Sequence, residues 1–171
     1  MASASNVLSR LTARDISSAK SFQVNACELI EADHARIAAL FAEFERAASQ
    51  GDVDKQGVAA QILLELKVHM QVVEEIFHPA ACNALEDVDA VRRVLDRHSV
   101  VRRLIAQLET EAGSAPDYDT KLMVLGEYAM RDVELEERAL FPQVQASGMD
   151  LVGVGVALNF RRYELLTAMR A

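Results

Sequence analysis

The 171-residue sequence contains little of the material from which β-sheets are built, with seven glycines, three prolines, no tryptophan and an aromatic fraction of 5%. Turn-forming and aromatic residues are what strands and hairpins require, so this scarcity favours helices. No apolar run is long enough to span a membrane, and the first twenty residues lack the apolar stretch of a secretory signal. The sequence therefore predicts an all-α protein that is cytoplasmic and has no membrane partner.

Cysteine and positive charge are also scarce. The two cysteines, Cys27 and Cys82, form no CxxC pattern, and a chain of this length with 51% hydrophobic residues can bury a core without disulfides, so we expect reduced thiols. The 26 acidic residues outnumber the 18 basic ones, and the net charge of −8 has the wrong sign for binding nucleic acid. The motifs GxSxG, GxxxxGK[ST] and GxGxxG are absent from the sequence, which weakens a hydrolase or nucleotide-binding interpretation.

Apolar residues recur at spacings of three and four residues in four long segments and one shorter segment, which is the pattern of amphipathic helices. The first segment runs from about residue 27 to 49, the second is expected to end at Pro79, and the fourth at Phe141 and Pro142. The short fifth helix is expected at residues 149–169. Four long helices with short connections predict an antiparallel up-down four-helix bundle, here with a short C-terminal helix added.

Each of the four long apolar stripes is interrupted by an ionisable side chain, which needs a polar partner if it is buried. Counting outward from the expected turns places these residues at the same depth in the bundle to within about 3 Å. By contrast, His78 lies nine residues beyond His69, about 180° around an ideal helix, so it is predicted to be on the surface and not to be a ligand. The residues predicted to form one interior layer are His34, His69, His98, Asp132 and Glu136.

Such a layer must neutralise its own charge, and two arrangements achieve this. The imidazoles and carboxylates can hydrogen-bond directly to one another as a structural network. Alternatively they can bind a transition metal, because imidazole and carboxylate together suit iron, manganese, zinc or cobalt and helical bundles build two-metal sites from such ligands. Glu65, one turn before His69, is predicted either to orient that histidine or to be a partly exposed charge.

Four stretches of the sequence resemble the hemerythrin-like, HHE cation-binding family: LIEADHARIAALFAEF (29–44), LKVH with EEIFHP, LDRH ending at His98, and ELEERALFP ending at Pro142. The resemblance covers residues 25–171 as one domain, after a partly flexible N-terminal segment at 1–24. It implies a bundle that holds non-haem iron, with zinc or manganese as alternatives, and a role in sensing or handling oxygen, peroxide or nitric oxide. By the same resemblance, His34, His69, His98 and Glu136 match ligand positions of the family.

Two positions depart from the family pattern. When Pro79 is aligned with Pro142, Val73 stands where a bridging carboxylate is expected, and Asp132 stands where a histidine is expected. Glu74 is one residue late and would reach the site only if the helix were overwound or bulged. We therefore expect one tightly bound ion and a second that is weak or absent. The competing interpretation is a bundle that has lost metal binding and serves in protein interaction.

Overall fold

The computed structural model describes residues 24–51, 54–111 and 113–170, and this part of the chain is helical without a β-strand, which confirms the predicted all-α class. The predicted N-terminal segment, residues 1–24, lies outside the described residues apart from Val24. Some helices follow one another without a break and form five continuous segments. In chain order the elements are α3 (Ala26–Gln50), α4 (Lys55–Val72), the π-helix η1 (Val73–Phe77), α5 (His78–Ala84), α6 (Asp89–Thr110), α7 (Tyr118–Leu135), the π-helix η2 (Glu136–Leu140), α8 (Phe141–Ala146) and α9 (Leu151–Arg170).

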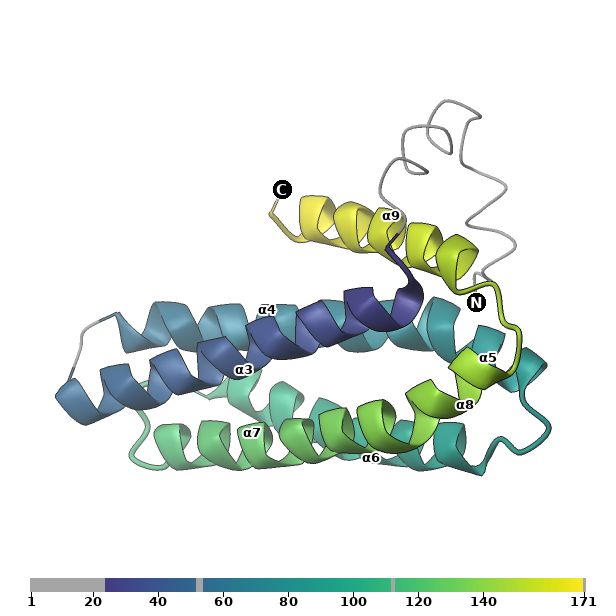
Figure 1. The fold of residues 1–171 in the computed structure, drawn as a ribbon. Helices are drawn as coiled ribbons and strands as arrows, with labels where there is room; N and C mark the ends of the chain where they lie inside the picture. The colour runs from purple at the N-terminus through teal and green to yellow at the C-terminus, as the bar shows by residue number, and fades with distance from the viewer. Residues whose placement is uncertain (1–23, 52–53, 112, 171) are drawn as a thin grey trace.

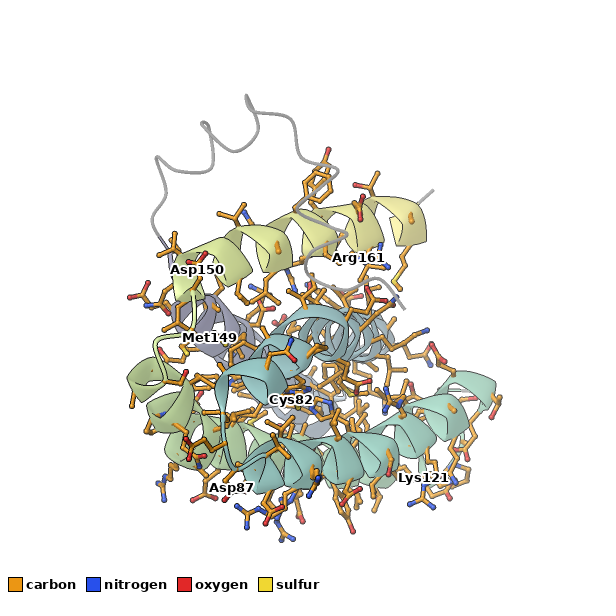
Figure 2. All side chains as sticks on the ribbon, turned by 90° about the vertical axis from the view of Figure 1, so that its right-hand side faces the viewer. Cys82, Asp87, Lys121, Met149, Asp150 and Arg161 are labelled. Atoms are coloured by element: carbon orange, nitrogen blue, oxygen red, sulfur yellow. The ribbon has the colours of Figure 1, made fainter. Side chains whose placement is uncertain are left out.

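The long helices lie side by side in layers (Figure 1). One layer is formed by α3 and α4 and the next by α6 and α7, with contacts between α3 and α7 joining them. Helix α9 packs on α3 and α4. Figure 2 shows α9, which carries the labelled Arg161 and begins just after the labelled Asp150, on the side of these helices that faces away from α6. None of the described helices is long and apolar enough to cross a membrane.

Helix α3 has sequence signals at both ends that explain its boundaries. Asn25 accepts a hydrogen bond from the backbone N–H of Glu28, and the Glu28 side chain accepts one from the backbone N–H of Asn25, which is a complete capping box. At the other end, Gly51 adopts a left-handed conformation with φ of 65° and ends the helix. The predicted segment at about 27–49 is therefore confirmed to within one residue at each end.

The two π-helices, η1 and η2, each lie just before a proline. The N–H of His78 bonds to the carbonyl of Val73, and the N–H of Phe141 bonds to the carbonyl of Glu136, five residues back in each case. These wide turns displace the carbonyls with which a proline ring would clash in a regular α-helix. The predictions that the helices end at Pro79 and Pro142 were therefore wrong, because the chain stays helical to Ala84 and Ala146.

The apolar core is divided into two clusters along the bundle. One cluster gathers around Phe77 and Phe141 and includes residues of α9, and the other gathers around Phe41 and Phe44. Most of the buried ionisable residues lie, in sequence, where a helix passes from one cluster to the other. The described residues with a buried polar or charged side chain are His34, Glu65, His69, His78, His98, Asp132 and Glu136.

Candidate metal centre

All five residues that the sequence assigned to one interior layer are buried and face the same small cavity, whose volume is about 20 Å³. That volume accommodates one water-sized sphere. They come from five elements, since His34 lies on α3, His69 on α4, His98 on α6, Asp132 on α7 and Glu136 on η2. Apolar side chains, including Leu66 and Val101, form the rest of the cavity wall.

Three of these residues already have their donor atoms close together. One donor atom each from His34, His69 and Glu136 lie within 4.8 Å of one another, and Nε2 of His34 is 3.1 Å from Oε2 of Glu136. Two ligand atoms that are each about 2.1 Å from the same ion lie roughly 3.0–3.4 Å apart. The 3.1 Å between Nε2 of His34 and Oε2 of Glu136 therefore suits two ligands of one ion. Two imidazoles and one carboxylate are a donor set that suits Fe(II) with open positions.

Two glutamates hold the histidines from outside the cavity. Oε1 of Glu137 lies 2.8 Å from Nδ1 of His34, and Oε1 of Glu74 lies 2.8 Å from Nδ1 of His98. Because an ionised carboxylate only accepts, each Nδ1 carries the donated proton and each Nε2 is left for the interior. The bulge at η1 is what brings Glu74 into reach. Sequence reasoning missed Glu137, although both glutamates lie five residues before their prolines.

The prediction that His78 lies on the surface was wrong. Its side chain is 2% exposed, its Nε2 lies 2.9 Å from Oε1 of Glu136, and its ring centroid is 5.5 Å from that of His98. The reason is the extra residue in η1, which reduces the rotation between His69 and His78 from about 180° to about 80°. A sequence signal existed, because His78 aligns with the buried Phe141 when the two prolines are superposed.

Asp132 is a carboxylate without a hydrogen-bond partner. Both of its oxygens are buried and make no hydrogen bond, and the nearest cationic atom is Nη1 of Arg97 at 3.6 Å. Burial raises the pKa of Asp132 to about 6. A buried polar group without a partner is costly, so a carboxylate in this position beside a small cavity fits a site that receives a cation.

The charge state of the other residues is set by burial and by their contacts. Burial lowers the pKa of His69, which favours the neutral form that binds metals. Burial alone opposes ionisation of Glu136, but its hydrogen bonds with His34 and His78 keep the pKa of Glu136 well below its usual range. Burial also opposes protonation of His34, but its hydrogen bonds with Glu136 and Glu137 raise its pKa. The metal-free interior thus contains a proton that a bound cation would displace.

An ionic network lies behind His69 and involves α9. Oδ2 of Asp33 is 3.8 Å from Nδ1 of His69, and Arg162 bonds to Asp33 at 3.1 Å and also to Glu65. Glu65 therefore bonds to arginines, including Arg36, and not to His69, so neither predicted role for Glu65 was correct. Asp33 is the carboxylate closest to orienting His69, and it was missed because its arginine partner comes from the far end of the chain.

Replacing Arg162 by methionine is expected to reduce the free energy of unfolding by about 1–3 kcal/mol, because two mostly buried carboxylates lose a charged hydrogen-bond donor. The control is Arg138→Met, which removes an exposed ion pair with Glu134 and should change stability by less than about 0.5 kcal/mol. Urea denaturation of the two variants measures the difference. If Arg162→Met and Arg138→Met reduced the free energy of unfolding equally, the Arg162 network would not stabilise the fold.

Comparison with known proteins agrees with this geometry. Residues 25–144 match the family described as the hemerythrin HHE cation binding domain. The chain is also 25% identical over 122 residues to a protein named DNA nickase from Nostoc sp. (strain PCC 7120 / SAG 25.82 / UTEX 2576), a match that covers 71% of this chain and 34% of that relative. The chain thus spans about a third of that relative's length, and no solved structure matches it. From the family match, this chain belongs to the hemerythrin HHE cation-binding domain family.

Proposed function

We propose that this protein binds a transition-metal ion, most simply iron, through His34, His69 and Glu136, and that His98 and Asp132 contribute to the same centre. The observation that supports this proposal best is the set of three donor atoms within 4.8 Å of one another in a buried setting. We also propose the antiparallel up-down order of the four long helices. The short connections between consecutive long helices support that order.

When bound, iron supplies redox chemistry and open positions for a small ligand such as oxygen, peroxide or nitric oxide. The protein's own residues set the conditions for that chemistry. Glu137 fixes the ring of His34, and the apolar wall of the cavity, with Leu66 and Val101, limits the entry of water. The buried Asp132 adds a second carboxylate beside the cavity, which favours binding of a cation. These properties support our proposal that the protein senses or handles such small oxidants, and we place that role in the cytoplasm as the sequence predicts.

A bundle that has lost metal binding is the competing interpretation. A decayed site has no reason to keep the buried, unbonded Asp132, because replacing it by an apolar residue would remove a penalty. DNA nicking is not carried over from the relative, because this chain spans a third of that protein and has a net charge of −8.

Adding Fe(II) under anaerobic conditions to metal-free protein is expected to raise its melting temperature at pH 7.5 by about 5–10 °C when free metal is roughly 100 times its Kd. The increase should shrink at pH 5.5, because an imidazole must lose its proton to bind metal and His34, with its raised pKa, holds its proton more strongly. Differential scanning calorimetry at both pH values measures the two shifts.

The matched control is the double variant His34→Gln and His69→Gln, which removes both imidazoles and should show no metal-dependent shift at either pH. Elemental analysis of protein purified without added metal gives the second measurement, with at least about 0.5 ion per chain expected for an affinity in the usual range of such sites. No metal above background together with no shift in melting temperature would overturn the proposal.

A further inference from the structure

We propose that His78 is a ligand of a second metal position, which it forms with His98, Asp132 and Glu136. This inference rests on the proposed function, because both positions share Glu136. The expectation of a weak or absent second ion assumed that His78 lay on the surface. The structure buries it instead against the part of the centre that had lost its usual donors.

The contacts of Glu136 indicate a bridging role. Its Oε2 lies 3.1 Å from Nε2 of His34, and its Oε1 lies 2.9 Å from Nε2 of His78. Each oxygen thus has an imidazole of its own, at close to the separation of about 3 Å expected for two ligands of one ion. A carboxylate that joins two metal ions uses one oxygen for each, and Glu136 is arranged for that use.

The internal repeat of the bundle shows why a histidine at position 78 is informative. When the prolines are aligned, His78 corresponds to Phe141, whose ring stacks on His34 with centroids 6.2 Å apart and an interplanar angle of 4°. In the other half, His78 lies 5.5 Å from His98, the counterpart of His34. The phenyl ring of Phe141 thus lies beside His34 at the first metal position, whereas the imidazole of His78 lies beside His98 at the second, where Asp132 replaces the family's histidine.

An ion at the second position would compete with the guanidinium of Arg97, 3.6 Å from Oδ1 of Asp132, but would break no hydrogen bond of that carboxylate. Nδ1 of His98 is engaged by Glu74, which leaves its Nε2 as the donor, and both oxygens of Asp132 are buried without a hydrogen bond. Nδ1 of His78 also has no hydrogen-bond partner, so the hydrogen bond of this ring is the one between Nε2 and Glu136. Two imidazoles and two carboxylates form a donor set that suits iron, manganese or zinc.

The second position is looser than the first. Within the described part of the chain, the three donors within 4.8 Å of one another are those of His34, His69 and Glu136. The second ion must displace the proton between His78 and Glu136 and draw in His98 and Asp132. We therefore expect it to bind after the first ion and more weakly.

The experiment must separate a ligand from a residue that only hydrogen-bonds to Glu136. The variant His78→Gln keeps an N–H donor for Glu136 but lacks the imidazole nitrogen. Metal-free full-length protein is titrated with Co(II), with calorimetry and visible absorption as readouts. Wild type should bind two ions in sequence, and His78→Gln should bind the first normally and the second more than about 100-fold more weakly, beyond the 10–100-fold typical of residues that act through a ligand.

Glu137→Gln is the matched control, because Glu137 acts on the first position through His34 and should weaken that ion by only about 10–100-fold. Wild-type protein labelled with ¹⁵N-histidine and loaded with Zn(II) gives a readout that needs no variant, since Nε2 of His78 should show the chemical shift of a metal-bound nitrogen. A His78→Gln variant that binds two ions as tightly as wild type, a wild type that binds a single ion, or an unshifted His78 signal would overturn the inference. A wild type that binds no ion would overturn the proposed function itself.

Discussion

Replacing Glu136 by glutamine is expected to abolish metal uptake at pH 7.5 and to reduce the free energy of unfolding of the metal-free protein by roughly 3 kcal/mol. Glu136 is 1% exposed and its two oxygens serve two different buried imidazoles, those of His34 and His78. Glutamine keeps the shape but loses the negative charge, so a protonated His34 would keep only the partly exposed Glu137 as its counter-ion. The same change removes the carboxylate shared by both proposed metal positions.

The pH dependence of this difference follows from the lowered pKa of Glu136. A carboxyl group whose pKa is lower in the folded state stabilises the fold above its ordinary pKa of about 4.5, and that contribution is lost as the pH falls through the lowered value. The gap in stability between wild type and Glu136→Gln should therefore be present near neutral pH and close in strong acid. Urea denaturation of the metal-free proteins across this pH range measures it.

The exposed Glu134 provides the control, because Glu134→Gln removes only an ion pair with Arg138 and should change stability by less than about 0.5 kcal/mol. A Glu136→Gln protein that takes up metal as wild type does would show that Glu136 is not a ligand. A metal-free variant as stable as wild type would show that the buried hydrogen bonds to His34 and His78 contribute little.

The helices and their buried faces were predictable because they depend on local periodicity. The residues His34, His69 and His98 were found as interruptions of apolar stripes, and the structure buries all three beside one cavity. That method assumes a constant rotation of about 100° per residue. It therefore works up to His69 and fails at His78, because η1 lies between them.

The π-helices were not predictable from sequence because contacts with other helices accompany them. Glu74 in η1 bonds to His98 and Arg102 on α6, and Glu137 in η2 bonds to His34 on α3. Such contacts compensate for the poorer backbone geometry of a wide turn, and they join residues far apart in the sequence. The same explanation applies to Asp33, whose role depends on Arg162 of α9. Sequence patterns thus identified the layer of buried ionisable residues, while the residues that hold this layer in place required the three-dimensional structure.

Asp132 and Glu136 lie one turn apart on the continuous helical segment formed by α7 and η2. We nevertheless expect opposite changes in the stability of the metal-free protein when the charge of each is removed. Asp132→Asn should raise the free energy of unfolding at pH 7.5 by about 2 kcal/mol, because the pKa of Asp132 is raised from 3.8 to about 6 and each unit corresponds to about 1.4 kcal/mol. The expected gain is smaller than the pKa shift multiplied by about 1.4 kcal/mol per unit, because the asparagine amide would also be buried at a position where the carboxylate has no hydrogen-bond partner.

The sign of the pH dependence for Asp132 is the reverse of that for Glu136. A carboxyl group whose pKa is higher in the folded state destabilises the fold at high pH, and this penalty is relieved as the pH falls from about 6 towards 4. The advantage of Asp132→Asn over wild type should shrink over that range. The control is Asp33→Asn, which should destabilise the protein, because the nearby His69 and the charge of Arg162 lower the pKa of Asp33 despite its burial.

Metal should reverse the order of stability of the Asp132 pair. With saturating Co(II), wild type gains the binding free energy of the second position, whereas Asp132→Asn has lost a charged donor there and should gain less. Thermal unfolding of both proteins with and without Co(II) at pH 7.5 tests this reversal. A variant that is more stable than wild type without metal, and no less responsive to metal, would show that Asp132 is not a ligand. A reversal would show that a residue that weakens the empty fold is kept for the ion it binds.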